Sequence, residues 1–137
     1  MKVSEIMTTN VECIAPEASI ESIAQKMKTL DVGFLAVCDQ DRLAGTVTDR
    51  DIVIRGIAAG RDMKSATVRD VMTHEVHWSY ETDDIDDVAE AMSEKQVKRM
   101  LILNDEKRLV GVVSLGDISK VEEKESGKTL RDISEAA

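Results

Sequence analysis

Apolar residues recur with helical spacing in two stretches of the chain. The first stretch follows Ser19, and its apolar stripe consists of Ile20, Ile23, Ala24, Met27 and Leu30. The second follows Asp84, with Ile85, Val88, Ala89 and Met92 on the stripe. Positions that recur every three or four residues share one face of a helix, and Ser and Asp are favoured N-caps. The pattern therefore predicts two amphipathic helices, of which the first ends at Leu30.

Continuous apolar runs of strand length lie before and after each predicted helix. "VECIA" precedes the first helix, and "GFLAVCD" and "RMLILND" follow the first and the second helix. Each of these last two runs leads through a polar turn into "LAGTVT" or "LVGVVS", which is typical of a hairpin. A further helix is predicted from about Asp49 to Ala59, and a shorter one after Ser114. Each half of the chain therefore reads β-α-β-β-α.

The two halves are copies of one sequence. A shift of 65 residues aligns "SEIMT" with "RDVMT" and Ile20 with Ile85, and one extra residue in the second turn makes the shift 66 between Gly45 and Gly111. We place the first motif at residues 1–66 and the second at residues 67–137. We call the segments "SEIMT" and "RDVMT", at the start of the two copies, the lead-ins. Near the end of the chain "TLRDIS" is a third version of a lead-in, and we expect it to pack like one.

A repeat that occurs twice predicts a pair of supersecondary units with pseudo-twofold symmetry rather than a solenoid. Three strands and two helices do not close a core alone at this size. We therefore expect an α+β fold in which the two β-α-β-β-α units pack sheet to sheet. The composition fits a globular protein, because 42% of the 137 residues are hydrophobic and 33% are charged.

The charge excludes some partners. The formal net charge is −9, which opposes non-specific attraction to nucleic acid or anionic lipid, because phosphate contacts need local Lys or Arg. The sequence contains no apolar run of the roughly 20 residues that a membrane span needs, and the start "MKVSEIMTTN" has no signal-peptide pattern. We therefore expect a cytoplasmic protein that binds neither nucleic acid nor membrane.

One short motif occurs in both copies. "GTVTDRDI" and "GVVSLGDI" each end a hairpin with a hydroxyl residue, two variable positions and an aspartate, namely Thr48 with Asp51 and Ser114 with Asp117. This spacing is typical of a capping box at a helix start. A carboxylate also accepts two hydrogen bonds, so the aspartate could hold the vicinal hydroxyls of a ribose. The two roles are compatible, and both stay open.

Together with the lead-ins "SEIMT" and "RDVMT" and the strand ends "LAVCD" and "LILND", the repeated motif resembles paired CBS domains, also called a Bateman module. The resemblance covers nearly the whole chain. It implies a regulatory module, not an enzyme, that binds AMP, ADP or ATP, or else NAD or S-adenosylmethionine, in clefts between the two motifs. It also implies a homodimer that signals to a separate, unknown effector protein. The alternative is a ligand-free structural or interaction dimer with vestigial clefts, linked to stress.

The resemblance also implies which residues contact the ligand. The expected ligand-binding residues are Thr48, Arg50, Asp51, Lys98, Arg99, Ser114 and Asp117. Among them the basic residues would meet phosphates, although solvated surface ion pairs are an alternative. The residues expected to line the adenine pocket are Cys13, Ala15, Trp78 and Tyr80. Aromatic residues that fill the cleft and exclude the base are the alternative there.

Two cysteines and two histidines complete the candidate chemistry. Cys13 and Cys38 are expected to lie close together on strands of one sheet, as two buried thiols in a reducing cytosol that oxidation could join. His74 and His77, with a cysteine, could supply zinc ligands, but on an extended segment their side chains point to opposite faces. We therefore expect no metal site. A Cys-His nucleophile would need an orienting third group, which the sequence does not supply.

Overall fold

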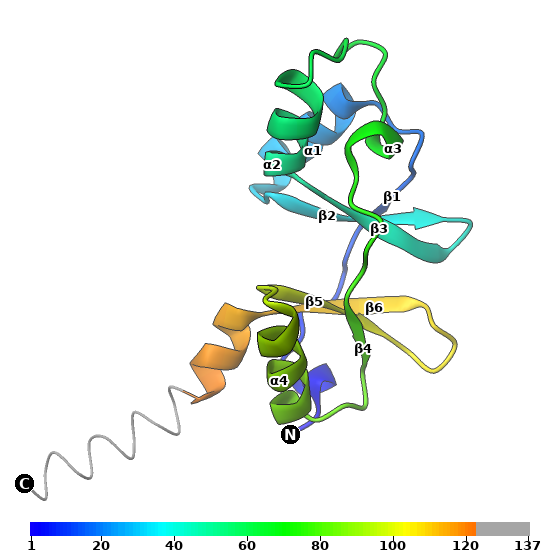
Figure 1. Cartoon of the computed structure of the whole chain (residues 1–137). Helices are drawn as coiled ribbons and strands as arrows, with labels where there is room; N and C mark the ends of the chain where they lie inside the picture. Colours follow the sequence, from blue (N-terminus) through cyan, green and yellow to red (C-terminus); the bar gives the residue numbers. More distant parts are fainter. Residues whose placement is uncertain (123–137) are drawn as a thin grey trace, which may run out of the picture. The chain divides into compact units, whose positions relative to one another are not determined.

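Strands and helices alternate in the order that the hydrophobic pattern predicts. The computed structural model describes residues 1–122, which form mixed α+β structure with two three-stranded sheets (Figure 1). The first part of the chain contains the 3₁₀ helix η1 (Val3–Glu5), β1 (Cys13–Ile14), α1 (Ile20–Leu30), β2 (Phe34–Asp39), β3 (Arg42–Thr48), α2 (Asp49–Asp51) and the π-helix η2 (Ile52–Ile57). The second part contains α3 (Val68–Val71), β4 (Trp78–Tyr80), α4 (Ile85–Lys95), β5 (Arg99–Leu103) and β6 (Leu109–Ser114), and residues 115–122 are again helical.

The chain forms two compact units, and each unit combines parts of both sequence copies. Among the described residues, unit 1 contains Met1–Asn10, His77–Glu106 and residues 110–122, whereas unit 2 contains Val11–Val76 and Lys107–Leu109. The lead-in of each sequence copy therefore belongs to the unit that holds the other copy's sheet. Each unit is completed by a segment from far away in the sequence, so neither copy carries all of its own core.

The glycine of the repeated motif is the place where the lead-in meets the sheet. In unit 2 the backbones of Thr46 and Thr73 exchange two hydrogen bonds, of 3.0 and 2.8 Å, directly after Gly45. In unit 1 Thr8 and Val112 exchange the same two bonds, of 2.8 and 3.0 Å, after Gly111. A Cβ atom on either glycine would collide with the lead-in, which explains the residue without reference to a ligand.

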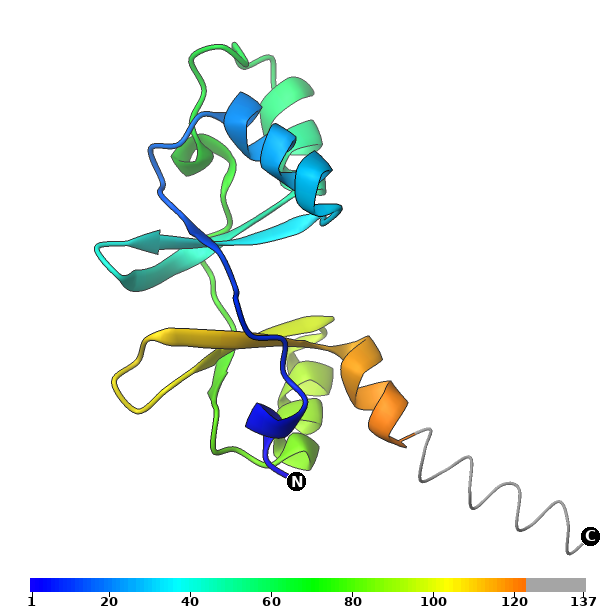
Figure 2. The ribbon, with the colours of Figure 1, turned by 180° about the vertical axis from the view of Figure 1, so that it is seen from behind.

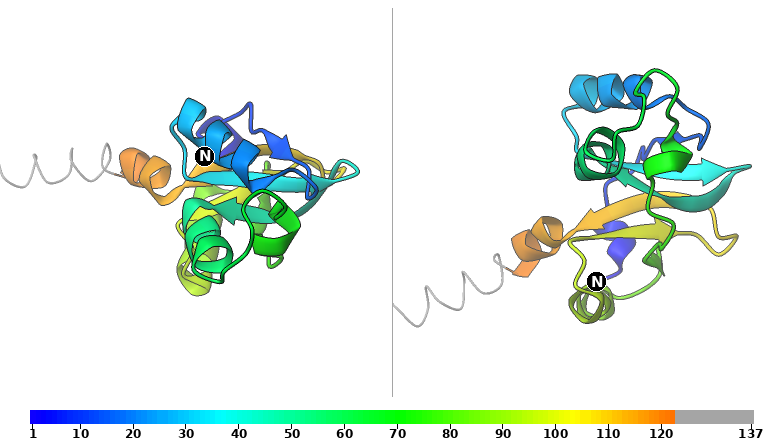
Figure 3. Two further views of the ribbon diagram at one scale, coloured as in Figure 1. Left: turned by 90° about the horizontal axis from the view of Figure 1, so that it is seen from above. Right: turned by 45° about the horizontal axis from the view of Figure 1, so that its top comes forward.

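The core of unit 2 lies between the sheet β1-β2-β3 and the elements α1, η2 and α3, which cover one face of that sheet (Figure 3). As predicted, Ser19 is the N-cap of α1, where its hydroxyl accepts a hydrogen bond from the amide of Ser22. The buried side of α1 is narrower than the stripe in the sequence, because Leu30 is 48% exposed and Ala24 is also exposed. The buried cluster consists of Ile14, Ile20, Ile23, Met27, Leu35, Val37, Val47, Ile52, Ala66, Val68, Val71 and Met72.

The core of unit 1 lies between α4, β5, β6 and the N-terminal segment, which runs beside α4 (Figure 2). Asp84 is the N-cap of α4, as predicted, and it also forms an ion pair of 3.3 Å with the N-terminal amino group of Met1. The amide of Ile85 in turn donates to the carbonyl of Met1. The buried cluster consists of Val3, Ile85, Val88, Met92, Met100, Ile102, Val113 and Ile118.

Both sheets have the same strand order. β1 pairs in parallel with β2, and β2 pairs in antiparallel fashion with β3, with Phe34 opposite Thr48 and a bulge after Val37. β4 pairs in parallel with β5, and β6 lies on the other side of β5. The parallel pair is the one that α1 or α4 connects, which is the usual arrangement for a β-α-β crossover. The antiparallel pair is the predicted hairpin.

Some sequence-based boundaries need correction. The predicted strand over "VECIA" is reduced to Cys13–Ile14. The helix predicted from Asp49 to Ala59 ends at Ile57, and after one turn it becomes a π-helix, which spacing of apolar residues does not reveal. The fragment "TLRDIS" lies outside the described residues. Among the helices within residues 1–122, none has the length and apolar character of a membrane span.

Candidate functional site

The repeated hydroxyl and acid form capping boxes in both units. In unit 2 the amide of Thr48 donates to Oδ2 of Asp51 (3.0 Å), and the amide of Asp51 donates to Oγ1 of Thr48 (3.1 Å). In unit 1 the amide of Ser114 donates to Oδ2 of Asp117 (2.9 Å), and the amide of Asp117 donates to Oγ of Ser114 (3.0 Å). The structural interpretation of the motif is therefore realised in both copies.

A third pair of the same spacing provides an internal comparison. The amide of Thr67 donates to Oδ2 of Asp70 at 2.9 Å at the start of α3, a position that the resemblance does not associate with a ligand. The other carboxylate oxygen of Asp70 lies 3.7 Å from the guanidinium of Arg61. Hydrogen-bond geometry at the helix start therefore does not by itself indicate a binding site.

Asp51 and Asp117 differ from Asp70 in the surroundings of Oδ1, the carboxylate oxygen that makes no capping hydrogen bond. Within residues 1–122 no donor reaches Oδ1 of Asp51 or of Asp117, and both side chains are half-buried. An ionised carboxylate has about four acceptor positions, and the capping bond uses one of them. Each of these two aspartates can therefore cap its helix and still accept a hydrogen bond from a hydroxyl group of a ligand.

Basic residues lie beside the second motif. The amide of Leu115 donates to the carbonyl of Lys98 at 2.8 Å, so the start of β5 lies against the start of the helix that Ser114 caps. Lys98 and Arg99 are both exposed. The structure therefore brings together four of the residues predicted from sequence, all within unit 1. Arg50 is likewise exposed beside the first motif, in unit 2.

The two aromatic residues of the second lead-in strand contact each other. The rings of Trp78 and Tyr80 have centroids 5.0 Å apart and meet edge to face, with an interplanar angle of 83°. Trp78 is 36% exposed and pairs with Leu101, two residues along β5 from Arg99. Part of Trp78 is therefore exposed on the strand next to the basic start of β5, where an aromatic surface could stack on a base.

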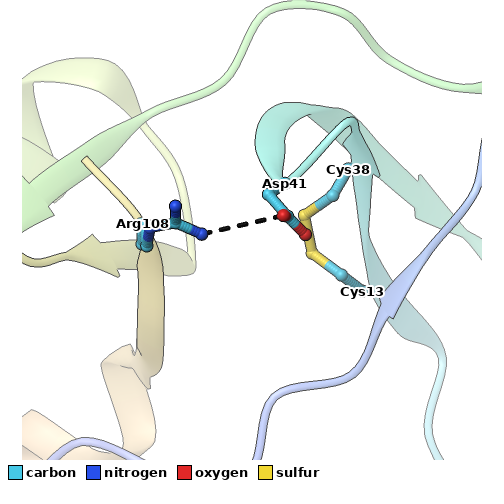
Figure 4. Close-up of a disulfide and its surroundings, with 4 residues drawn as sticks. All are labelled: Cys13, Cys38, Asp41 and Arg108. Carbon is cyan, nitrogen blue, oxygen red and sulfur yellow. Dashed lines mark ion pairs between the residues drawn. A yellow bond between two sulfur atoms is a disulfide. The ribbon is translucent and has the colours of Figure 1, made fainter. Parts of the chain in front are cut away.

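The corresponding strand of unit 2 carries a disulfide. Cys13 and Cys38 are joined, and their Cα atoms lie 5.5 Å apart on the neighbouring strands β1 and β2 (Figure 4). The expectation of two buried thiols is wrong, because Cys13 is exposed and Cys38 is half-buried. Ala15, the other residue expected to line a pocket here, is exposed as well.

Ion pairs surround the end of β2, and sequence patterns did not identify them. Asp41, next to the disulfide, lies 3.7 Å from Arg108 (Figure 4). Arg69 binds Glu17 at 2.7 Å and lies 3.7 Å from Asp39. The hydrogen bond from Arg69 lowers the pKa of Glu17 below its ordinary value. These groups are exposed, so each pair contributes little to the free energy of unfolding. The partners of these three pairs are 67, 52 and 30 residues apart in sequence, and only the fold brings them together.

Within the described part of the chain no three His, Cys, Asp or Glu side chains are grouped as a metal site would need. His74 is exposed and His77 is half-buried, on the segment between α3 and β4. The structure therefore supplies no cluster of candidate metal ligands in residues 1–122.

Comparison with known proteins now identifies the family. The family model for the CBS domain matches residues 3–56 and residues 68–124. The chain is 38% identical to Hypoxic response protein 1 of Mycobacterium tuberculosis over 117 residues, which are 85% of this chain and 81% of that protein. The chain belongs to the CBS domain family, as a pair of CBS domains.

Solved structures agree with the fold. A crystal structure of Hypoxic Response Protein I with two coordinated zinc ions has a TM-score of 0.78 and 36% identity, and the match covers 88% of this chain and 98% of that one. The CBS domain pair of protein MJ0100, in complex with 5′-methylthioadenosine and S-adenosyl-L-methionine, has a TM-score of 0.78 and 25% identity, with 91% of this chain and 98% of that chain covered.

Proposed function

We propose that this protein is a regulatory module that binds an adenosine-containing nucleotide through its two repeated motifs and transmits the bound state to a separate effector protein. The observation that carries the proposal is the free acceptor position at the half-buried carboxylates of Asp51 and Asp117. The MJ0100 domain pair supports it, since that protein binds two adenosine compounds. The proposal includes no catalytic step.

In unit 1 the proposed contacts come from β4, from the start of β5 and from the start of the helix that follows β6. Asp117 accepts hydrogen bonds from the ribose, and the hydroxyl of Ser114 lies beside it. Lys98 and Arg99 offset the overall charge of −9 locally and attract phosphates. The exposed face of Trp78 stacks on the base. A ligand that makes these contacts in only one conformation of the protein shifts the population toward that conformation, which is the signal to the effector.

In unit 2 Thr48 and Asp51 make the equivalent contacts, with Arg50 nearby. The strand that offers Trp78 in unit 1 offers Cys13 here, and its sulfur is bonded to Cys38. The second motif is therefore our first choice for a nucleotide, because it has both more positive charge and an aromatic surface.

The test is a calorimetric titration of AMP and ATP into the wild type and two variants. Asp117→Ala removes an acceptor for ribose hydroxyls and is expected to lower affinity about tenfold to a hundredfold at the second motif. Asp51→Ala is expected to do the same at the first motif. Absence of binding by the wild type would send the function to the alternative, a ligand-free interaction dimer.

Asp70→Ala is the matched control. It removes the hydrogen bond from the amide of Thr67 to Oδ2 of Asp70, which is 2.9 Å long, as is the bond from the amide of Ser114 to Oδ2 of Asp117. Asp70 lies at a position without a proposed ligand. All three variants should lose a similar free energy of unfolding, about 1 kcal/mol. Only Asp51→Ala and Asp117→Ala should lose affinity, and equal binding by all three variants would mean that the motif is a helix cap alone.

We propose further that the protein is a cytoplasmic homodimer. The π-helix η2 exposes three large apolar side chains within five residues, Val53 (50%), Ile54 (51%) and Ile57 (60%). Burial of such a patch between two copies would stabilise a dimer. Light scattering should report twice the chain mass of 15.1 kDa, and Ile54→Lys with Ile57→Lys should give the monomer mass. A wild-type mass of 15.1 kDa would contradict the dimer.

A further inference from the structure

The two motifs differ in charge at one structurally equivalent place. In unit 2 the amide of Asp49 donates to the carbonyl of Gly33 at 3.0 Å, and in unit 1 the amide of Leu115 donates to the carbonyl of Lys98 at 2.8 Å. The shared bond makes Gly33 the counterpart of Lys98 and Asp49 the counterpart of Leu115. The first motif therefore has a carboxylate where the second has a leucine, and no side chain where the second has a lysine.

Gly33 provides the space that the carboxylate of Asp49 occupies. A Cβ atom on Gly33 would lie 2.8 Å from Oδ2 and 3.1 Å from Cγ of Asp49, closer than side chains normally approach. The φ angle of Gly33 lies outside the left-handed region, so the backbone does not require a glycine here. The carboxylate of Asp49 therefore uses space that a side chain at position 33 would occupy, and it places a negative charge beside the start of β2.

Arg50 does not reverse this charge. Its amide donates to Oδ1 of Asp49 at 2.8 Å, and in sequence its single positive charge stands between the two carboxylates of Asp49 and Asp51. The charged residues at the first motif are Asp49, Arg50 and Asp51, whereas those at the second are Lys98, Arg99 and Asp117. The first set sums to −1 and the second to +1.

We propose that the first motif selects an adenosine compound without phosphates, whereas the second motif takes the nucleotide. This inference rests on the proposed function, because it assumes that Asp51 accepts the ribose hydroxyls. A 5′-phosphate belongs to the same sugar as the hydroxyls that Asp51 would accept, and Asp49 is two residues from Asp51, so we expect the phosphate to feel the charge of Asp49, which salt screens over about 8 Å. Like charges repel over that distance, whereas a neutral 5′ group meets no repulsion and a cationic one is attracted.

The test isolates each motif and titrates adenosine and ATP at low salt. In the Asp117→Ala protein binding at the second motif is weakened about tenfold to a hundredfold, so the tighter binding that remains reports the first motif, where adenosine should bind at least as tightly as ATP. Addition of Asp49→Asn keeps the acceptor for the amide of Arg50 and removes the charge. This change should raise the ATP affinity about five- to tenfold and leave the adenosine affinity unchanged.

The reciprocal change is the matched control. In the Asp51→Ala protein binding at the first motif is weakened, so the tighter binding reports the second motif, and Leu115→Asp places a carboxylate at the equivalent position. ATP affinity should fall there by a similar factor, while adenosine affinity stays the same. High salt should reduce both charge effects, which a change in packing would not do.

Each other outcome has a definite meaning. Tighter binding of ATP than of adenosine by Asp117→Ala, with no response to Asp49→Asn, would overturn this inference and leave the proposed function standing. Loss of all binding in Asp117→Ala would also overturn it, because the first motif would then hold no ligand. Failure of the wild type to bind either compound would overturn the proposed function itself.

Discussion

Replacement of Gly45 by alanine should break the contact that joins a lead-in to the sheet. The added Cβ would meet the carbonyl oxygen of Thr73 and lie 2.5 Å from Cε of Met72. Forced overpacking costs about 1–3 kcal/mol. Displacement of the lead-in also weakens the two backbone bonds between Thr46 and Thr73, at about 1 kcal/mol each. Alanine also reduces the conformational entropy of the unfolded chain at this position, which offsets about 0.5 kcal/mol of the loss in the free energy of unfolding.

The expected loss for Gly45→Ala is therefore about 3 kcal/mol in the free energy of unfolding. Gly111→Ala should cost less, because the atoms in its way belong mainly to the flexible side chain of Met7. Gly116→Ala is the control, since the nearest atom is 3.5 Å away and the residue lies in a helical segment where alanine is favoured.

Urea denaturation gives the three free energies, and hydrogen exchange at the amides of Thr46 and Thr73 locates the effect. Both amides should exchange faster in Gly45→Ala and stay protected in Gly116→Ala. If Gly45→Ala were as stable as the wild type and the amide of Thr73 stayed protected, Gly45 would not be required for the contact between the lead-in and the sheet.

Two further predictions concern unit 2. The disulfide closes a loop of 25 residues, so Cys13→Ser with Cys38→Ser should lower the free energy of unfolding by about 3.5 kcal/mol in the chain-entropy model. A reductant should lower the wild type to the same value, and identical stability with and without reductant would contradict this. The pKa of Glu17, lowered by Arg69, means that their stabilisation is present above the unfolded pKa and lost as pH falls through the folded pKa. NMR titration should show a higher pKa for Glu17 in Arg69→Gln, and an unchanged value would exclude the pair as the cause.

Local sequence signals gave the helices and most strands correctly. Ser19 and Asp84 were predicted correctly as N-caps, because a side-chain oxygen directly before an amphipathic stretch can accept a hydrogen bond from a backbone amide of the first helical turn. The duplication likewise indicated two sheets of the same order. These features depend on neighbours a few residues away, which the sequence displays directly.

Features that depend on distant segments were not visible in the sequence. The exchange of lead-ins between the copies sets the composition of each unit, and self-alignment cannot distinguish exchange from its absence. The position of the Asp49 carboxylate beside Gly33 depends on a contact between residues 16 apart, which no local pattern shows. The exposure of Cys13 also depends on which face of β1 is covered, and a two-residue strand has too few positions to show alternation.

The central claim is that the repeated motif binds an adenosine compound in addition to capping a helix. The most direct measurement is an amide NMR titration of the wild type with AMP, which observes all three capping pairs in one spectrum. The amides of Ser114 and Asp117 should shift in a saturable way, while those of Thr67 and Asp70 should stay in place and serve as the internal reference. The account would be contradicted if the amides of Ser114 and Asp117 did not shift at saturating AMP. It would also be contradicted if those amides and the amides of Thr67 and Asp70 shifted equally.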